Sequence, residues 1–105
     1  MTKQERMQIA ETIVKQMGGF GRLGAMVNGR DFVTLENGGV QFTFSGKRGM
    51  NKCVIKLDAD DTYTMEFWYY NKRTYDIKKV WEMSGMYWDM LIPVFEQETG
   101  LYLSL

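Results

Sequence analysis

Short runs of alternating apolar and polar residues, separated by turn-forming residues, limit the possible folds of this chain more than any other feature. A period of two is typical of half-buried strands, and tight turns between them favour antiparallel pairing of neighbours. The longest run predicts a strand over 63–70, with Trp68 and Tyr70 facing away from the core. Asn28-Gly29 predicts a two-residue hairpin turn. Shorter runs predict strands over 23–27, 31–35, 40–44, 53–57 and 75–83.

A helix is predicted over 2–17, before the first strand. Thr2 is the expected N-cap, and Glu5 follows three residues later, which is the spacing of a capping box. Gly18 and Gly19 are expected to end the helix. Apolar residues recur at the spacing of one buried helical stripe, namely Ala10, Ile13, Val14 and Met17.

A second helix is predicted after the last strand, capped by Ser84 and ended by Thr99-Gly100. Pro93 lies inside this segment, and an interior proline kinks a helix at a cost of about 3 kcal/mol. We predict one kinked helix, and the alternative is a helix that begins near Pro93, because proline fits the first helical turn. The apolar tail, 101–105, is expected to pack on the domain.

These segments together predict an α+β fold with an N-terminal helix, a curled antiparallel sheet of about five to six strands and a C-terminal helix. The 105 residues fit a single domain, 1–105. Hydrophobic residues make up 45% of the chain and charged residues 25%, which argues against disorder.

Charge and residue content exclude several classes of function. The 13 basic residues balance the 13 acidic ones, whereas a protein that binds phosphates usually carries a positive excess. The chain has no histidine, so catalysis and metal sites that need imidazole are excluded. Its single cysteine, Cys53, can form neither an intrachain disulfide nor a cysteine-based zinc site, and its place in a strand predicts a packing role. We therefore expect no cofactor, no metal and no enzymatic activity.

The N-terminal residues are charged and lack the apolar segment of a signal peptide, and no apolar run approaches the length of a membrane span. These observations predict a protein of the cytoplasm that does not act at a membrane.

Three motifs invite a chemical interpretation that their context weakens. Gly19, Gly21 and Gly24 match the dinucleotide-binding pattern, but that pattern needs a strand before it and a helix after it. A helix stop is therefore predicted. A second motif, Asp58, Asp60 and Asp61, lies between strands and lacks the spacing of a calcium loop, so we predict a solvated turn and leave a weak cation site open. The third, Glu66, is expected to be a cross-strand charge partner and not a catalytic acid.

Aromatic and basic residues gather around the predicted turn at 71–74, and they are the candidate binding residues. Such a mixture is typical of protein interfaces, of single-strand nucleic-acid sites and of an ordinary aromatic core. The expected partner-binding residues are Trp68, Tyr70, Lys72 and Arg73. Residues for a nucleic-acid or secondary contact are Lys47, Arg48, Lys52, Lys78 and Lys79.

Scattered motifs over nearly the full length resemble a family of small proteins of tailed bacteriophages and prophages. The most specific part is G-M-Y-x-D-x-L, starting at Gly85, followed by F-x-x-x-T-G-L-Y-x-S-L, starting at Phe95. Pro93 departs from the uninterrupted helix that the family pattern implies. The other matching pieces are Lys15–Gly19, Asp31-Phe32, Asn51–Leu57, Asp61–Tyr63 and Glu66-Phe67.

The resemblance implies expression inside a bacterial host and brings no particular activity with it. Small phage domains without catalytic residues often bind a host protein, including components of CRISPR and other defence systems. The leading hypothesis is therefore a non-enzymatic protein-binding domain that inhibits a defence system or another host factor. The alternative is a nucleic-acid or nucleotide-binding protein. Monomer and homodimer both remain open.

Overall fold

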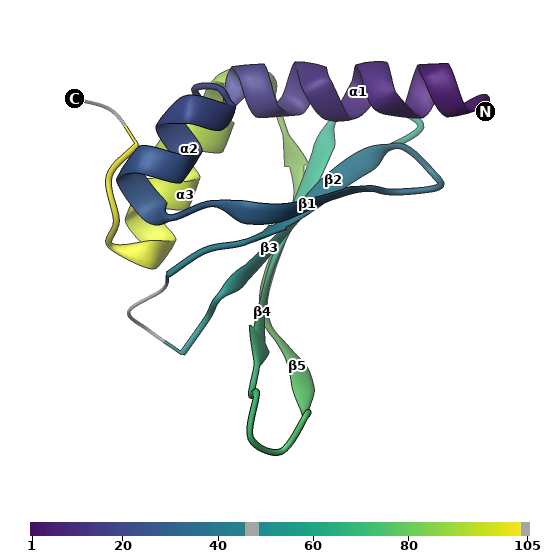
Figure 1. The fold of residues 1–105 in the computed structure, drawn as a ribbon. Helices are drawn as coiled ribbons and strands as arrows, with labels where there is room; N and C mark the ends of the chain where they lie inside the picture. Colours follow the sequence, from purple (N-terminus) through teal and green to yellow (C-terminus); the bar gives the residue numbers. More distant parts are fainter. Residues whose placement is uncertain (46–48, 104–105) are drawn as a thin grey trace.

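Five strands and three α-helices make up the computed structural model, which describes residues 1–45 and 49–103. The mixture confirms the predicted α+β class, with a helix before the sheet and a helix after it (Figure 1). The elements are α1 (Lys3–Gln16), α2 (Phe20–Val27), β1 (Arg30–Thr34), β2 (Gly39–Thr43), β3 (Lys52–Leu57), β4 (Tyr63–Tyr70), β5 (Ile77–Met86), the 3₁₀ turn η1 (Trp88–Met90) and α3 (Leu91–Thr99).

The sheet is an antiparallel meander in which every strand pairs with its neighbours in sequence, in the order β1-β2-β3-β4-β5. It is open, with β1 and β5 at its two edges. Phe42, Cys53 and Phe67 lie opposite one another across β2, β3 and β4, and all three are buried. The predicted alternation of these strands is therefore confirmed, because one register aligns their apolar residues on a single face.

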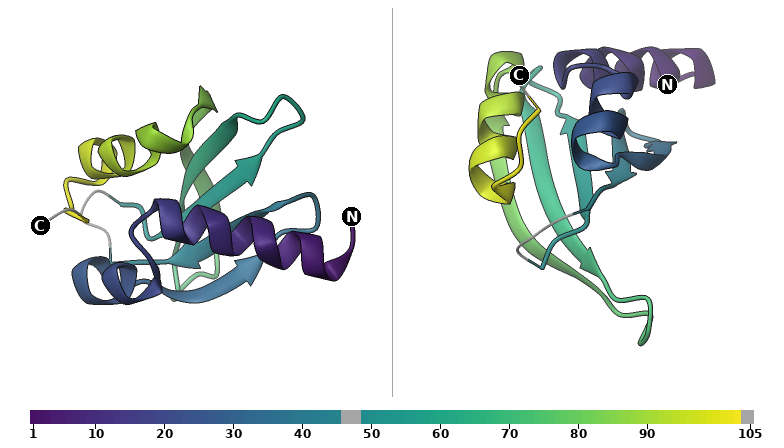
Figure 2. Two further views of the ribbon diagram at one scale, coloured as in Figure 1. Left: turned by 90° about the horizontal axis from the view of Figure 1, so that it is seen from above. Right: turned by 60° about the vertical axis from the view of Figure 1, so that its left-hand side comes forward.

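The helices cover that apolar face and close the core (Figure 2). Phe95 of α3 reaches the sheet, and its ring lies 5.3 Å from Phe44, 5.7 Å from Phe67 and 6.3 Å from Phe42, centroid to centroid. Helix α1 contributes Ile13 and other buried residues from the predicted stripe. Tilted ring packing of this kind adds roughly 0.5–1.5 kcal/mol per pair beyond area burial.

The start of α1 agrees with the sequence. The backbone N–H of Glu5 donates to the Thr2 hydroxyl at 3.1 Å, and the backbone N–H of Thr2 donates to the Glu5 carboxylate at 3.3 Å. This capping box satisfies donors that the first helical turn leaves without partners.

The predicted strand over 23–27 is wrong, because these residues belong to α2. Leu23 and Val27 are buried four residues apart, which is the spacing of one helical face. Asn28 does adopt positive φ, at 56°, but it caps the C-terminus of α2 and turns no hairpin. The sheet of the described residues therefore has five strands. The predicted helix stop is confirmed, because α1 ends at Gln16 and Gly18 adopts φ 107° just after it. The glycine motif also begins a second helix, which was not expected, with Gly19 as the N-cap of α2.

The prediction of one kinked helix from Ser84 is also wrong. β5 continues to Met86, and Ser84 lies within it, with its hydroxyl 3.0 Å from that of Thr64. Helix α3 begins at Leu91, so Pro93 is its third residue, where the missing N–H breaks no helical hydrogen bond. The alternative, a helix starting near Pro93, is closer to the structure.

The end of α3 agrees with the sequence, since Gly100 adopts φ 73° and caps the helix. Leu103, in the tail, is fully buried as predicted, whereas Tyr102 is 70% exposed, and residues 104–105 of the predicted tail lie outside the described residues. No helix in the described ranges has the length and hydropathy needed to cross a bilayer.

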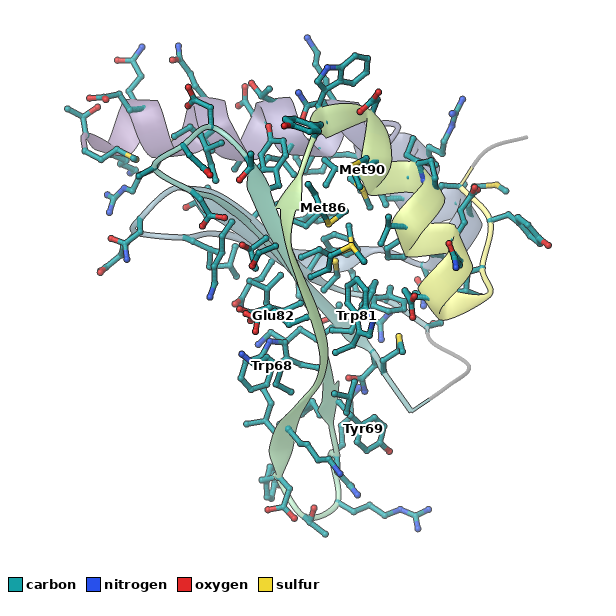
Figure 3. All side chains as sticks on the ribbon, turned by 180° about the vertical axis from the view of Figure 1, so that it is seen from behind. Trp68, Tyr69, Trp81, Glu82, Met86 and Met90 are labelled. Carbon is teal, nitrogen blue, oxygen red and sulfur yellow. The ribbon has the colours of Figure 1, made fainter. Side chains whose placement is uncertain are left out.

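The β4–β5 hairpin extends away from the helices, so its turn lies at the far end of the molecule from α1 (Figures 1 and 2). Tyr75 in this turn is 76% exposed. Trp68 and Glu82 lie on one side of the hairpin, and Tyr69 and Trp81 lie on the other (Figure 3). The hairpin therefore has two faces. Trp81 and Phe67 lie on the same face, and their ring centroids are 5.2 Å apart.

Candidate binding face

The face of the sheet opposite the helices is the candidate binding site, and we call it the open face. Register places Val33, Gln41, Val54 and Glu66 in one row across the first four strands. The next row begins at Thr43 and continues through Lys52, Trp68 and Lys79. Within the described ranges, no helix covers this face.

Two adjoining hollows form a groove along the open face. The first has a volume of about 360 Å³, and the second has a volume of about 410 Å³. Gln41, Lys52 and Ile77 line both, so the hollows are parts of one groove. Val33 of β1 and Ile77 of β5 line the same hollow although they belong to opposite edges of the sheet. The sheet must therefore curl, as expected from the sequence.

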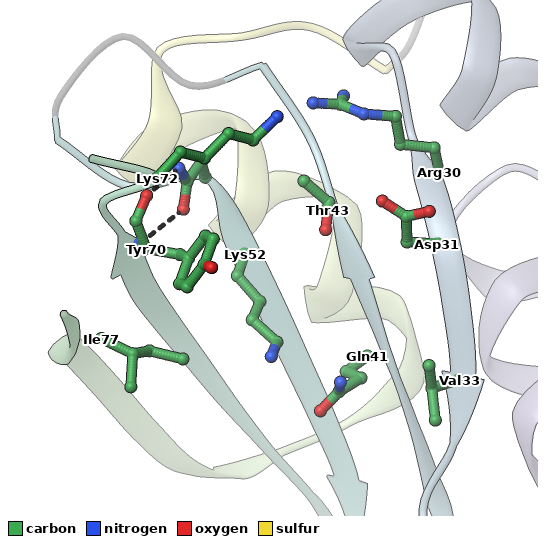
Figure 4. Close-up of a pocket in the computed structure, with 10 residues that line it drawn as sticks. Arg30, Asp31, Val33, Gln41, Thr43, Lys52, Tyr70, Lys72 and Ile77 are labelled. Atoms are coloured by element: carbon green, nitrogen blue, oxygen red, sulfur yellow. Dashed lines mark hydrogen bonds between the residues drawn. The ribbon is translucent and has the colours of Figure 1, made fainter. Parts of the chain in front are cut away.

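The first hollow combines a tyrosine with basic groups (Figure 4). Arg30 and Lys72 extend toward one another from opposite walls, Asp31 lies beside Arg30, and Lys52 crosses the floor near Tyr70 (Figure 4). Arg30 also donates to the carbonyl oxygen of its neighbour Asn28 at 2.9 Å, which anchors its position. Three cations against one carboxylate make this hollow locally positive, although the whole chain is neutral.

Asn51 fixes the tyrosine of this hollow through the backbone. Its side-chain amide donates to the Tyr70 carbonyl oxygen, and its amide oxygen accepts from the Tyr70 N–H, both at 2.9 Å. The phenol ring takes no part in either bond. The two bonds hold the backbone of Tyr70 at the groove, and they do not depend on its aromatic side chain.

Glu66 is the buried charge of the open face, with a side chain only 3% exposed. Its carboxylate accepts from the Lys56 ammonium at 2.6 Å and from the Trp68 indole N–H at 2.8 Å. Burial alone would raise the pKa of this carboxyl, but the two hydrogen bonds and the charges of Lys56 and Lys79 outweigh burial and lower the pKa. Glu66 thus acts as the cross-strand charge partner that the sequence predicted.

The same bonds make Trp68 part of the framework of the face. Its indole N–H is held by Glu66, and the Lys79 ammonium lies 5.9 Å from its ring centroid, within cation–π range. Lys79 also pairs with Glu82 at 3.4 Å. The hydrogen bond to Glu66 raises the pKa of Lys56, so both partners stay charged at neutral pH. These contacts therefore fix the positions of Trp68 and of the charged side chains around it.

The structure brings together some of the sequence-predicted residues and separates others. Trp68, Tyr70, Lys52 and Lys72 line the groove, and Lys79 lies beside Trp68 on the same face. Arg73 lies in the β4–β5 turn, where its backbone N–H donates to the Asn71 side chain at 2.9 Å. Lys78 pairs in register with Tyr69, so it belongs to the opposite side of the hairpin. Lys47 and Arg48 lie outside the described residues.

The groove residues that were not expected from the sequence include Arg30, Val33, Gln41 and Ile77. Val33, Gln41 and Ile77 lie in predicted strands, but the face that Val33 shares with Gln41 depends on the register of β1 against β2, which is irregular between Arg30 and Val33. A curled sheet was predicted, but local sequence patterns do not encode how far the curl brings β1 toward β5.

The aspartates at the β3–β4 turn accept hydrogen bonds from nearby residues of the chain. Asp60 accepts from the backbone and the hydroxyl of Thr62, at 3.1 and 2.7 Å. These bonds lower the pKa of the Asp60 carboxyl. Asp58 accepts from the Thr64 hydroxyl at 2.6 Å. Across the described residues, no group of three or more acidic or cysteine side chains is placed to hold a metal ion.

Cys53 lies in β3, on the helix side of the sheet, and is fully buried. Burial, together with the charge of Glu66, raises the pKa of its thiol well above the usual value. The prediction that Cys53 is a packing residue is confirmed, since a buried neutral thiol is a poor nucleophile.

The fold and the face define an α+β domain with an open, grooved antiparallel sheet. Comparison with protein-family models, with curated proteins and with solved structures finds no significant match to this chain.

Proposed function

We propose that the protein is a non-enzymatic protein-binding domain that holds an acidic segment of its partner in the groove of the open face. The observation that supports this most is the combination in one groove of half-exposed apolar side chains and basic groups. Val33 and Ile77 are 48% and 49% exposed, and Arg30 and Lys72 line the same hollow (Figure 4). Interfaces are typically built from an apolar centre and a charged rim.

The proposed class of partner comes from the resemblance to small phage proteins and not from the geometry of the groove. A bacterial host protein, such as a component of a defence system, is the proposed target, and the protein would act by covering a surface that the target needs. The resemblance to small phage proteins supports this part of the proposal. The charge of the groove adds that the contacted segment carries Asp or Glu.

Tyr70→Ala is the sharpest test of the groove, because the clamp from Asn51 holds the backbone of Tyr70 and leaves its ring free. Trp68→Ala would be ambiguous, since it also deprives Glu66 of a hydrogen bond. Tyr102→Ala is the matched control, because Tyr102 is 70% exposed and lies outside the groove.

The assay is affinity capture from bacterial lysate with nuclease, read by mass spectrometry, and then a binding titration with the purified captured protein. We expect a host protein whose dissociation constant rises roughly tenfold or more for Tyr70→Ala, as for a hot-spot residue, and stays unchanged for Tyr102→Ala. Equal loss in both variants, or none in Tyr70→Ala, would refute the groove as the binding site.

A second candidate function is nucleic-acid or nucleotide binding, which the positive first hollow with its tyrosine favours. Stacking of a base on Tyr70 would contribute about 1–3 kcal/mol, and phosphates would lie near Arg30, Lys52 and Lys72. This function requires affinity that falls steeply with salt. Capture that disappears after nuclease treatment, with a steep salt slope for a single-stranded oligonucleotide, would favour it over protein binding.

A further inference from the structure

Among the described strands, β5 forms the longer of the two sheet edges. β5 is ten residues long, comes last in the strand order and, among the described strands, pairs with β4 alone. Its residues from Ile77 to Gly85 are exposed except for the half-buried Trp81, so neither the helices nor the described part of the tail covers this edge. An exposed edge strand offers a row of backbone groups to another strand.

A bulge in β5 changes which residues share a face. Lys79 lies opposite Trp68 and Trp81 lies opposite Phe67, so Val80 is inserted between them. On the open face lie Ile77, Lys79, Glu82 and Ser84, opposite or bonded to Tyr70, Trp68, Glu66 and Thr64. On the helix face lie Lys78, Trp81 and Met83, opposite Tyr69, Phe67 and Met65.

The assignment of β5 residues to the two faces is symmetric about the peptide bond between Val80 and Trp81. If two copies of β5 run antiparallel about a two-fold axis at that point, Lys79 meets Glu82, Lys78 meets Met83 and Ile77 meets Ser84. Each pair comes from one face, as strand pairing requires. In a strand without the bulge, the same register would pair residues from opposite faces.

The charges fit the same register. Lys79 of one copy faces Glu82 of the other, and the two-fold axis repeats the pair, so each interface holds two opposite-charge pairs. The apolar Val80 and Trp81 of both copies meet at the centre. Lysines and bulges on an edge strand usually oppose pairing with another chain. Here the glutamate of the other copy neutralises the charge of the lysine, and both copies carry the same bulge.

We propose that the protein forms a two-fold dimer through antiparallel β5–β5 pairing, in which Lys79 of each copy pairs with Glu82 of the other. The dimer is one continuous sheet of ten strands, twice the five of a single chain. Because the axis runs perpendicular to the sheet, the two open faces point the same way. This proposal does not depend on what the groove binds.

The first experiment is sedimentation of the wild-type protein over a micromolar to millimolar concentration range. We expect a reversible monomer–dimer equilibrium within that range. A protein that stays monomeric throughout would overturn the proposal.

The second experiment separates contacts between chains from those within one chain. Lys79→Glu and Glu82→Lys each place like charges opposite one another in both interchain pairs, so each variant alone should raise the dimer dissociation constant by about tenfold. An equimolar mixture should recover dimerisation. One chain of the mixed dimer then carries carboxylates at both positions and the other carries ammonium groups at both, so the two interchain pairs are again of opposite charge. The pair within each chain stays like-charged in that mixture.

Circular dichroism establishes that both variants are folded, and the neutral pair Lys79→Gln and Glu82→Gln replaces them if either is not. The neutral variants should weaken the dimer by a smaller factor than charge reversal. Dimerisation of both charge-reversed variants at wild-type affinity, or a mixture no tighter than its components, would show that β5 does not pair in this register.

Discussion

The clearest prediction concerns the buried carboxylate of Glu66 and the pH dependence of stability. Glu66→Gln keeps an oxygen that can accept from the Trp68 indole, but it removes the charge that pairs with Lys56. A hydrogen bond to a charged group contributes about 1.5–3 kcal/mol, and an exposed ion pair contributes about 0.2–1 kcal/mol. Lys56 is 47% exposed while Glu66 is 3% exposed, so an intermediate cost of about 1–2 kcal/mol is expected at pH 7.

The sign of the pH effect follows from the lowered pKa of Glu66. A carboxyl whose pKa is lower in the folded state stabilises the fold above its unfolded pKa, near 4.5, and loses that contribution as pH falls through the folded pKa. Glutamine does not titrate. The stability difference between wild type and Glu66→Gln should therefore be constant from neutral pH down to about 5.5 and should narrow as pH falls further toward about 3.

Urea unfolding followed by tryptophan fluorescence measures this difference at each pH, and thermal melts provide a second measure. For a domain of this size, 1 kcal/mol corresponds to about 4–8 °C in Tm. Glu36→Gln, in the exposed β1–β2 turn, controls for the loss of one surface carboxylate. A Glu66→Gln difference that is constant across the pH range, or that matches the control at every pH, would refute the role assigned to Glu66.

Three other outcomes are expected. Phe95→Ala removes the ring at the centre of the core and should lower the free energy of unfolding by about 3–5 kcal/mol in urea titrations. Gly39→Ala should destabilise by roughly 1–3 kcal/mol, because a Cβ there would overlap the Ile55 carbonyl oxygen, whereas Gly21→Ala, in open space on α2, should stabilise by about 0.5–1 kcal/mol. Cys53 should react with a thiol reagent only as fast as the protein unfolds, measured by the rate of labelling across denaturant concentrations.

Each of these outcomes has a contrary result. A Phe95→Ala protein as stable as wild type would mean that α3 does not complete the core. Similar effects of the two glycine substitutions would contradict the close approach of β2 to β3 at Gly39. Fast labelling of Cys53 in native conditions would contradict its burial.

The sheet could be predicted from the sequence because its signals are local. Runs such as 40–44 and 63–70 alternate cleanly, and turn residues separate them, so strand number and pairing order followed closely. Helix α2 was missed because its eight residues include two glycines and only two buried positions, Leu23 and Val27. Asn28 added to the error, since positive φ serves a helix C-cap as well as a hairpin turn.

The candidate face could be predicted only in part. Trp68 and Tyr70 were placed on the side away from the core by alternation alone, and the structure has them there. The groove itself depends on the curl of the sheet, which brings Arg30 and Val33 of β1 near Ile77 of β5. That curl comes from twist accumulated over five strands, and local residue patterns do not encode its extent.

The meander also has a consequence for the order in which the chain acquires its structure. Every strand pairs with its neighbour in sequence, so the hairpins form from short loops, and topologies dominated by near-neighbour contacts fold fast. The core is different, because Phe95 and Leu103 follow all five strands and yet are fully buried within it. A nascent chain that has made its hairpins would still expose the phenylalanines of β2 and β4 until α3 docks, and this interval is when aggregation is most expected.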